Sequence, residues 1–323
     1  MKRRELLQAS AVLLALPGLA RAQPAYPTRP IRYIVPVAAG GGNDMIARVV
    51  TQRWGAVIGQ PFVVDNQGGG GGVIASQTVA RAAPDGYTLM QGYVATHGTN
   101  PATRRVPYDA IKDFTPIGMI GATPNALVVA SVVPVKTVAE FIDYVKKNPG
   151  KVNYGSAGPG SLTHLTMELL KHEAGLDLTH IPYKGIAPAF NDLLGGQTQA
   201  MFPGLAAALP HLRSGRARAL AVTGKQRSTQ LPDVPTMEEA GFKGFDAMQW
   251  YGSVGPAGMP ADVVKRLNET QVTVLKDPDL REKLAVEAVE PWPMTPEQFG
   301  QYIRSEIQRW TALAKARNIR LED

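Results

Sequence analysis

The sequence contains no cysteine, and this absence excludes several kinds of site at once. Without thiols the chain has no disulfide, no thiolate metal ligand and no cysteine nucleophile. A large excess of charge is also missing. The chain has 34 Lys and Arg residues and 27 Asp and Glu residues. Four of the basic residues and one of the acidic residues lie in the first 22 positions, so the rest of the chain has 30 basic and 26 acidic residues. This balance is too mild for a nucleic-acid-binding surface, so we expect no nucleic-acid partner.

The apolar run near the N-terminus is short. It covers residues 9–16, whereas a transmembrane helix needs about 20 apolar residues. The run follows Lys2, Arg3 and Arg4 and precedes an A-x-A pattern that ends at Ala22. This order is typical of a signal peptide, and we expect cleavage after Ala22. The adjacent arginines fit either the twin-arginine or the general secretory route.

Complete signatures of catalytic and cofactor sites are absent as well. The glycine pattern that starts at Gly40 has Met45 where a dinucleotide-binding turn needs glycine. Residues 155–158 lack the register of a nucleophile elbow. A zinc-protease helix that started at His172 would need a second histidine where this chain has Leu176. We therefore expect no catalytic residue, no metal and no cofactor.

The histidines and the basic pairs are spread along the chain. We interpret the histidines as capping or packing residues. They are His97, His164, His172, His180 and His211. The pair Arg104 and Arg105 and the pair at 146–147 are interpreted as solvated surface.

Strands and helices are predicted to alternate with short turns between them, which indicates an α/β fold with parallel strands. The pattern runs from 31 to about 121, restarts near 124, and ends in helices beyond 260. The second half is thus predicted to be inserted into the first. We expect two lobes, with connections near 121–124 and 247–252. The predicted boundaries are 1–22 for the signal peptide, 23–122 with 249–323 for lobe 1, and 123–248 for lobe 2.

The last predicted helix covers residues 296–316 and has an apolar stripe. Its members recur at helical spacing and are Phe299, Tyr302, Ile303, Ile307 and Trp310. Such a stripe is typical of a helix that faces the core, and a partner-binding helix is the alternative.

Two glycine-rich turns, each between a predicted strand and a predicted helix, are candidate anion-binding sites. Turn one is defined as residues 40–44 and turn two as residues 156–161. Glycine lets the backbone N–H groups point outward, and the start of a helix adds partial positive charge. Asn43 or Asp44 is the expected N-cap of the helix after turn one. The alternative is that the glycines only make tight turns.

Several motifs resemble those of the Bug family, the extracytoplasmic solute receptors of tripartite tricarboxylate transport systems. They are YPTRPIR at 26–32, APDGYTL at 83–89, VPYD at 106–109, PYKG at 182–185, DLLGGQ at 192–197, ALAVT at 219–223 and LPDVPT at 231–236. The resemblance extends from about residue 26 to 317. It implies a two-lobed periplasmic-binding-protein (Venus-flytrap) fold, in which each lobe is a mostly parallel sheet flanked by helices.

The resemblance further implies a monomeric periplasmic receptor without catalysis, which holds a small carboxylate between its lobes and delivers it to a membrane permease. A sensory subunit that presents ligand to a signalling protein is the alternative. An exported hydrolase that uses Ser156 or Ser161 with His164 is a further one. The family's ligand contacts correspond to both turns and to the loop after the third strand. The expected ligand-binding residues are Gly40, Gly41, Gly42, Asn43, Asp44, Tyr93, Thr96, Ser156, Ala157, Gly160, Ser161, Phe202 and Pro203.

Two departures from the family pattern bear on the ligand. Pro203 stands where the family often has aspartate, and Tyr93 stands where a small residue is common. With Phe202 and Trp250 they would give the crevice an apolar wall on which a ring could stack, unless Tyr93 and Phe202 pack inward. An ammonium group would lack a counter-ion there. We therefore expect an aromatic or otherwise amino-free carboxylate in preference to aspartate or glutamate.

Overall fold

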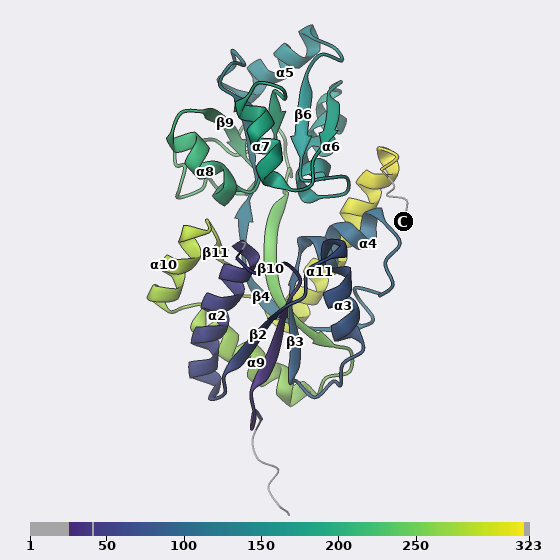
Figure 1. Ribbon diagram of the computed structural model, residues 1–323, viewed down its shortest axis with the longest axis vertical. Coiled ribbons are helices and arrows are strands. Elements are labelled where there is room, and N and C mark those ends of the chain that lie inside the picture. The colour runs from purple at the N-terminus through teal and green to yellow at the C-terminus, as the bar shows by residue number, and fades with distance from the viewer. Residues whose placement is uncertain (1–25, 41, 320–323) are drawn as a thin grey trace, which may run out of the picture.

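The structure is a computed structural model of the 323-residue chain, and it describes residues 26–40 and 42–319. The predicted signal peptide and its cleavage site after Ala22 lie outside the described residues, as does Gly41. Two sheets form separate halves of the molecule, one above the other in Figure 1. The predicted two-lobed α/β architecture is confirmed.

The lower sheet has six strands in the order β11-β4-β10-β3-β1-β2. Its strands are β1 (Ile31–Val35), β2 (Phe62–Asn66), β3 (Thr88–Tyr93), β4 (Phe114–Pro124), β10 (Met248–Pro256) and β11 (Glu290–Pro291). Strand β1 pairs in parallel with β2 and β3, whereas β10 is antiparallel to β3 and β4. Because β10 returns from the other half, it must run against the strand by which the chain leaves.

The upper sheet has five strands in the order β7-β6-β8-β5-β9. Its strands are β5 (Ala126–Ala130), β6 (Asn153–Ser156), β7 (Thr179–Pro182), β8 (Ala200–Met201) and β9 (Ala217–Val222). Strand β6 is parallel to β7 and β8, and β5 is antiparallel to both of its neighbours. Each sheet is therefore parallel apart from the strands that run against the rest, which are β10 and β11 below and β5 above.

Helices cover both sheets (Figure 1). They are α2 (Gly42–Ile58), α3 (Val73–Ala80), α4 (Asn100–Thr103), α5 (Val138–Lys147), α6 (Leu162–Ala174), α7 (Ile186–Leu194), α8 (Leu205–Arg213), α9 (Ala261–Val274), α10 (Pro278–Val286) and α11 (Pro296–Ala316), with short turns η1 (Gly70–Gly72) and η2 (Ala95–Thr99). Helix α11 has the predicted bounds, and its Phe299, Ile303 and Trp310 are buried in the core. The core-facing interpretation of its stripe is confirmed. Within the described ranges no helix is both long enough and apolar enough to cross a membrane.

The two halves also touch through α6 and α11. Leu162 and Leu165 of the upper helix α6 pack into the apolar core of the lower half. On the same helix Glu168 accepts a hydrogen bond of 2.9 Å from Arg317 at the end of α11. Burial of the apolar pair and this charge-assisted bond tie α6 to the lower half. The start of α6 is thereby positioned between the halves.

Candidate ligand-binding site

Turn one follows the carboxyl end of β1 and leads into α2. The helix begins at Gly42, so Asn43 and Asp44 lie in its first turn and neither is the predicted N-cap. Gly40 has a φ of 90°, which favours glycine because a β-carbon would be strained there. The amide groups of the first helical turn have no partner within the helix. The amides near Gly42 and Asn43 at turn one therefore make no bond within the helix.

The buried side chain of Asp44 holds the shape of turn one through hydrogen bonds. Its buried carboxylate accepts hydrogen bonds from Gly40 N (2.9 Å), Arg48 Nε (3.0 Å) and Asn66 Nδ2 (2.9 Å). Burial opposes ionisation of this carboxyl group, but the bonds from Arg48, Gly40 and Asn66 outweigh it and hold the pKa of Asp44 below its ordinary value. Asp44 thus acts as a brace, and it already uses the Gly40 amide that was expected to contact ligand.

Turn two follows the carboxyl end of β6 and leads into α6. Ser161 is the N-cap of α6: its Oγ accepts from His164 N (3.3 Å) and donates to Gly158 O (2.6 Å). Thr163 Oγ1 lies 2.9 Å from Ser161 Oγ and accepts from Ala157 N at 2.9 Å. The two hydroxyl groups therefore form a connected pair at the helix start, where a hydroxyl can rotate to donate to an anion.

Two histidine side chains hydrogen-bond to turn two. His164 Nδ1 accepts from Gly160 N (3.1 Å), and His180 Nε2 lies 2.7 Å from Ser156 Oγ. The rings stack with their centroids 4.1 Å apart. Burial lowers the pKa of both histidines to about 4, so both are neutral near pH 7. Their capping and packing roles are as expected from the sequence.

This arrangement does not support the hydrolase alternative. His164 bonds to the Gly160 amide rather than to Ser161, and its ring is therefore not placed as a base for that hydroxyl. Ser156 does meet an imidazole, that of His180, but Ser156 is fully buried and no substrate can reach it. No group of three side chains suited to a metal ion occurs among residues 26–40 and 42–319.

The thirteen expected ligand residues separate into accessible and buried sets. The accessible ones are Gly40, Gly42, Asn43, Ala157 and Ser161. The buried ones are Asp44, Tyr93, Thr96, Ser156, Gly160, Phe202 and Pro203, and Gly41 lies outside the described residues. The structure therefore brings the accessible candidates together only at the two turns.

The expected apolar wall is absent from the crevice. Phe202 is fully buried and stacks on Phe245 in the upper core, with ring centroids 5.9 Å apart. Trp250 is equally buried and donates to Glu306 Oε2 at 2.9 Å. Alternation along a strand shows that residues occupy opposite faces but not which face is covered. The prediction of a ring-stacking surface at Phe202 and Trp250 is therefore wrong.

Thr96 and Tyr93 also turn inward. Thr96 is fully buried, where its hydroxyl donates to Tyr93 O at 3.1 Å. Tyr93 is 8% exposed, and its hydroxyl donates to Gly71 O at 3.4 Å. Tyr93 and Thr96 are therefore held by hydrogen bonds within the lower half and do not line the crevice as expected.

Two residues that bear on the site were not singled out in the sequence. Thr163 holds the Ala157 amide, as described above. Glu287 lies beside turn one, because a β-carbon added to Gly42 would come within 2.8 Å of Glu287 Oε2. Nothing in the local sequence pairs residue 287 with residue 42, since the contact arises only when α10 folds against α2. Glu287 places negative charge at the edge of turn one.

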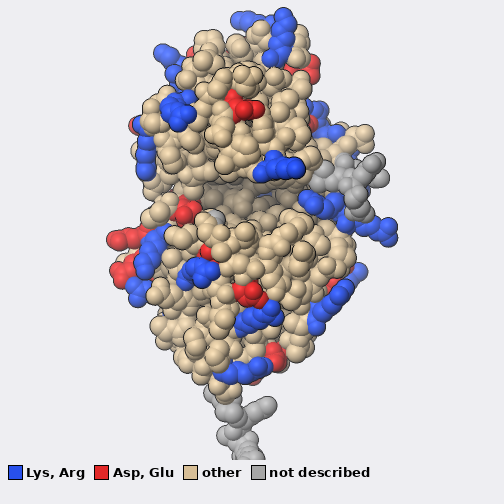
Figure 2. Space-filling model, viewed as in Figure 1, with Lys and Arg blue, Asp and Glu red and all other residues tan. Residues whose placement is uncertain are grey.

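A hollow separates the two halves. Figure 2 shows this crevice between the upper and lower halves, with a visible floor that is largely neither acidic nor basic. In Figure 1 the starts of α2 and α6 approach the gap from opposite sides. From these two views we infer that both helix N-termini lie near this crevice. Such termini can hold an anion without a charged side chain.

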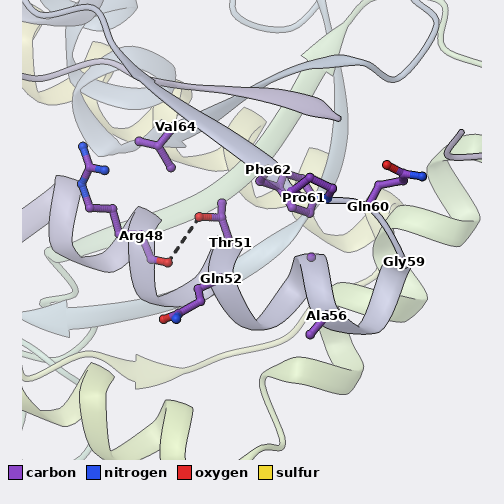
Figure 3. A pocket seen from close by; sticks show the side chains of 10 residues that line it. Arg48, Thr51, Gln52, Ala56, Gly59, Gln60, Pro61, Phe62 and Val64 are labelled. Carbon is purple, nitrogen blue, oxygen red and sulfur yellow. Dashed lines mark hydrogen bonds between the residues drawn. The ribbon is translucent and has the colours of Figure 1, made fainter. Parts of the chain in front are cut away.

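Another hollow lies between α2 and β2. Its volume is about 710 Å³. Figure 3 shows Arg48, Thr51 and Ala56 of α2 along one wall and Phe62 and Val64 of β2 along the other. It contains neither glycine turn. This hollow is therefore separate from the candidate site, which we identify by the two helix starts.

The comparisons with known proteins agree with the two-lobed fold. Residues 46–319 match the tripartite tricarboxylate transporter family receptor. Protein BugT of Bordetella pertussis is 35% identical over 330 residues, with all of both chains covered. A Rhodopseudomonas palustris protein, Rpa4515 with adipate, has a TM-score of 0.81 at 37% identity over 91% of this chain and 99% of its own.

A second solved structure is MatC from Rhodopseudomonas palustris with bound malate. It has a TM-score of 0.76 at 34% identity and covers 89% of this chain and 99% of its own. The match to the family receptor covers well over half of the chain, and the relatives align over nearly their full lengths. The chain therefore belongs to the tripartite tricarboxylate transporter receptor family, whose members are periplasmic solute-binding receptors and not enzymes.

Proposed function

We propose that this receptor binds a small organic carboxylate between turn one and turn two and delivers it to a tripartite-type membrane transporter. One observation carries the proposal: the starts of α2 and α6 approach the gap between the halves from opposite sides (Figure 1), where Figure 2 shows a hollow. The exposed amides near Gly42 and the hydroxyl of Ser161 would then hold the ligand from opposite sides. Closure of the halves would exclude water and strengthen these bonds.

The ligand we propose lacks an amino group. Pro203 supplies no carboxylate to pair with an ammonium ion, and it is buried. The related structures are described with adipate and with malate, neither of which carries an amino group. Because the ring-stacking wall is absent, aliphatic acids are better candidates than aromatic ones. Transfer of these ligands to the present chain is part of the proposal.

A binding screen tests the proposal. We expect malate, adipate or a related diacid to raise the melting temperature of the protein from residue 23 onward and to give a saturable heat in calorimetry, with glutamate weaker. In Ser161→Ala the loss of one charge-assisted hydrogen bond should weaken binding roughly 10- to 150-fold. Ser161→Thr retains the hydroxyl and should retain binding.

Ser214→Ala is the matched control. Ser214 ends α8, is exposed, and donates to His211 O, three residues earlier, as Ser161 donates to Gly158 O. Removal of the Ser214 hydroxyl should leave ligand affinity unchanged. If Ser161→Ala folded normally and bound as tightly as the unaltered protein, turn two would not be the carboxylate site. If no carboxylate bound at all, the proposed function itself would be wrong.

A further inference from the structure

Arg104 ends α4 and does not behave like the solvated surface residue that its sequence context predicts. Its Nε is buried and has no hydrogen-bond partner. Among the described residues no acidic side chain forms a salt bridge with it. The adjacent Arg105, in contrast, is exposed. The basic pair therefore consists of one surface arginine and one that is drawn inward.

The surroundings of Arg104 are polar but neutral. A β-carbon placed on Gly71 would lie 3.7 Å from Arg104 Nη2 and 3.4 Å from Asn100 Nδ2. Gly71 has a φ of 67°, and its carbonyl accepts from Asn100 Nδ2 at 2.9 Å. A side chain at this position would contact the guanidinium, so glycine leaves that side of Arg104 uncovered, with a small space beside it. Tyr93, whose hydroxyl donates to the same carbonyl, borders this space.

This space lies at the crevice edge of the lower half. Gly71 belongs to the loop between β2 and α3, and α4 follows the loop after β3. These parallel strands end at the same edge of the sheet as β1, and a β-carbon on Gly68 would lie 3.0 Å from Ala38 N, just before turn one. The guanidinium of Arg104 and turn one are therefore presented at one edge by neighbouring loops.

Physical chemistry favours an anion beside such a group. Arg104 is half-buried, and its buried Nε has no acceptor. A guanidinium N–H that loses water without gaining an acceptor is costly, and the cost is recovered when a carboxylate fits the planar fork. Asn100 and Tyr93 are held by Gly71 O and are not charged, so neither supplies the missing negative charge.

We propose that Arg104 is a specificity-determining residue, which binds the second anionic group of a ligand whose first carboxylate is held by the glycine turns. The inference rests on the proposed function and extends it to a residue outside both turns. The chemical class recognised is a planar anion, a carboxylate above all, on the far end of the ligand. A monocarboxylate would leave Arg104 unoccupied and bind by the turns alone.

The test compares Arg104→Gln with its matched control Arg105→Gln. Each variant is titrated by calorimetry with adipate, with malate and with the monocarboxylate hexanoate. We expect Arg104→Gln to weaken adipate or malate binding roughly 10- to 100-fold and to leave hexanoate unchanged. Arg105→Gln should alter neither. Arg104→Lys, which keeps the charge but loses the fork, should give an intermediate loss for the diacids.

Two outcomes would overturn the inference. One is unchanged diacid affinity in Arg104→Gln, and the other is an equal loss for diacid and monocarboxylate, which would indicate a structural role. If Arg104→Gln does not fold, Arg104→Lys decides by the same comparison of the two ligand classes. Failure of the unaltered protein to bind any of these acids would refute the proposed function and is thus distinguished from failure at Arg104.

Discussion

Turn one and turn two have similar sequences and different internal bonding. At turn one a single ionised side chain, Asp44, braces the backbone, while the helix start near Gly42 remains accessible. At turn two neutral side chains already occupy the backbone amides of Ala157 and Gly160. A glycine-rich sequence between a strand and a helix therefore indicates an anion site but not which donors are left for the anion.

The difference assigns distinct tasks to the two turns. Turn one can receive a carboxylate at the first-turn amides of α2, which make no bond within the helix, once the Glu287 side chain at its edge turns away. Turn two can do so through the Ser161 and Thr163 hydroxyls, which must rotate away from their present acceptors. Rotation of a hydroxyl is a small change. The second contact is therefore suited to form when the halves close over a ligand that turn one already holds.

The largest effect is expected from removal of the brace at turn one. Asp44→Ala deletes an acceptor shared by Gly40, Arg48 and Asn66, so the free energy of unfolding should fall by roughly 2–3 kcal/mol. Thr163→Val at turn two deletes one neutral acceptor and should cost about 1 kcal/mol. Urea unfolding of both variants measures the difference. Equal losses would mean that the turns are braced alike.

The pH dependence of the free energy of unfolding should also distinguish the two turns, with a smaller effect than the Asp44→Ala substitution. Burial lowers the pKa of His164 and of His180 from 6.5 to about 4. Between these two pH values the unfolded chain therefore binds more protons than the folded protein. Their stabilisation is complete above about pH 6.5 and is lost as the pH falls toward 4. When the pH falls from 6.5 to 5.5, this histidine pair should lower the free energy of unfolding by about 1–2 kcal/mol. Asp44, whose pKa is lowered, contributes fully above its ordinary value and loses its effect only at lower pH.

The histidine pair has charged neighbours that moderate this titration. Glu168 raises the pKa of both rings, Lys171 lowers it, and His164 lowers that of His180. The control is His180→Phe, which keeps an aromatic ring against Tyr154 and removes one titrating group. Its loss of stability between pH 6.5 and 5.5, measured by urea unfolding, should be about half that of the parent. An unchanged dependence on pH would show that these histidines do not govern it.

The sequence predicts the fold well because the fold depends on patterns that local spacing records. The alternation of strands and helices, the restart near residue 124 and the buried stripe of α11 all follow from such spacing. The start of α2 is missed by two or three residues, because Asn43 and Asp44 are good caps in general, yet the helix begins at Gly42. Asp44 instead reaches back to the amide of Gly40.

The site is less predictable because its partners come from distant segments. His180 meets Ser156 only because β7 pairs with β6 in one register, in which Gly155 is opposite Ile181. Glu287 reaches Gly42 from the C-terminal part of the chain. Phe202 turns into the core, and local alternation does not say which face of a strand is covered. Arg104 is half-buried and Arg105 is exposed, because the loop at Gly71, which is distant in the sequence, packs beside Arg104.

Hydrogen–deuterium exchange with and without saturating adipate or malate tests the central claim most directly. A ligand clamped between the helix starts should slow amide exchange at both turns together. The slowing should be larger at turn one, because the Ala157 and Gly160 amides of turn two are already hydrogen-bonded. Protection confined to one turn, or located at the α2–β2 hollow instead, would contradict the account.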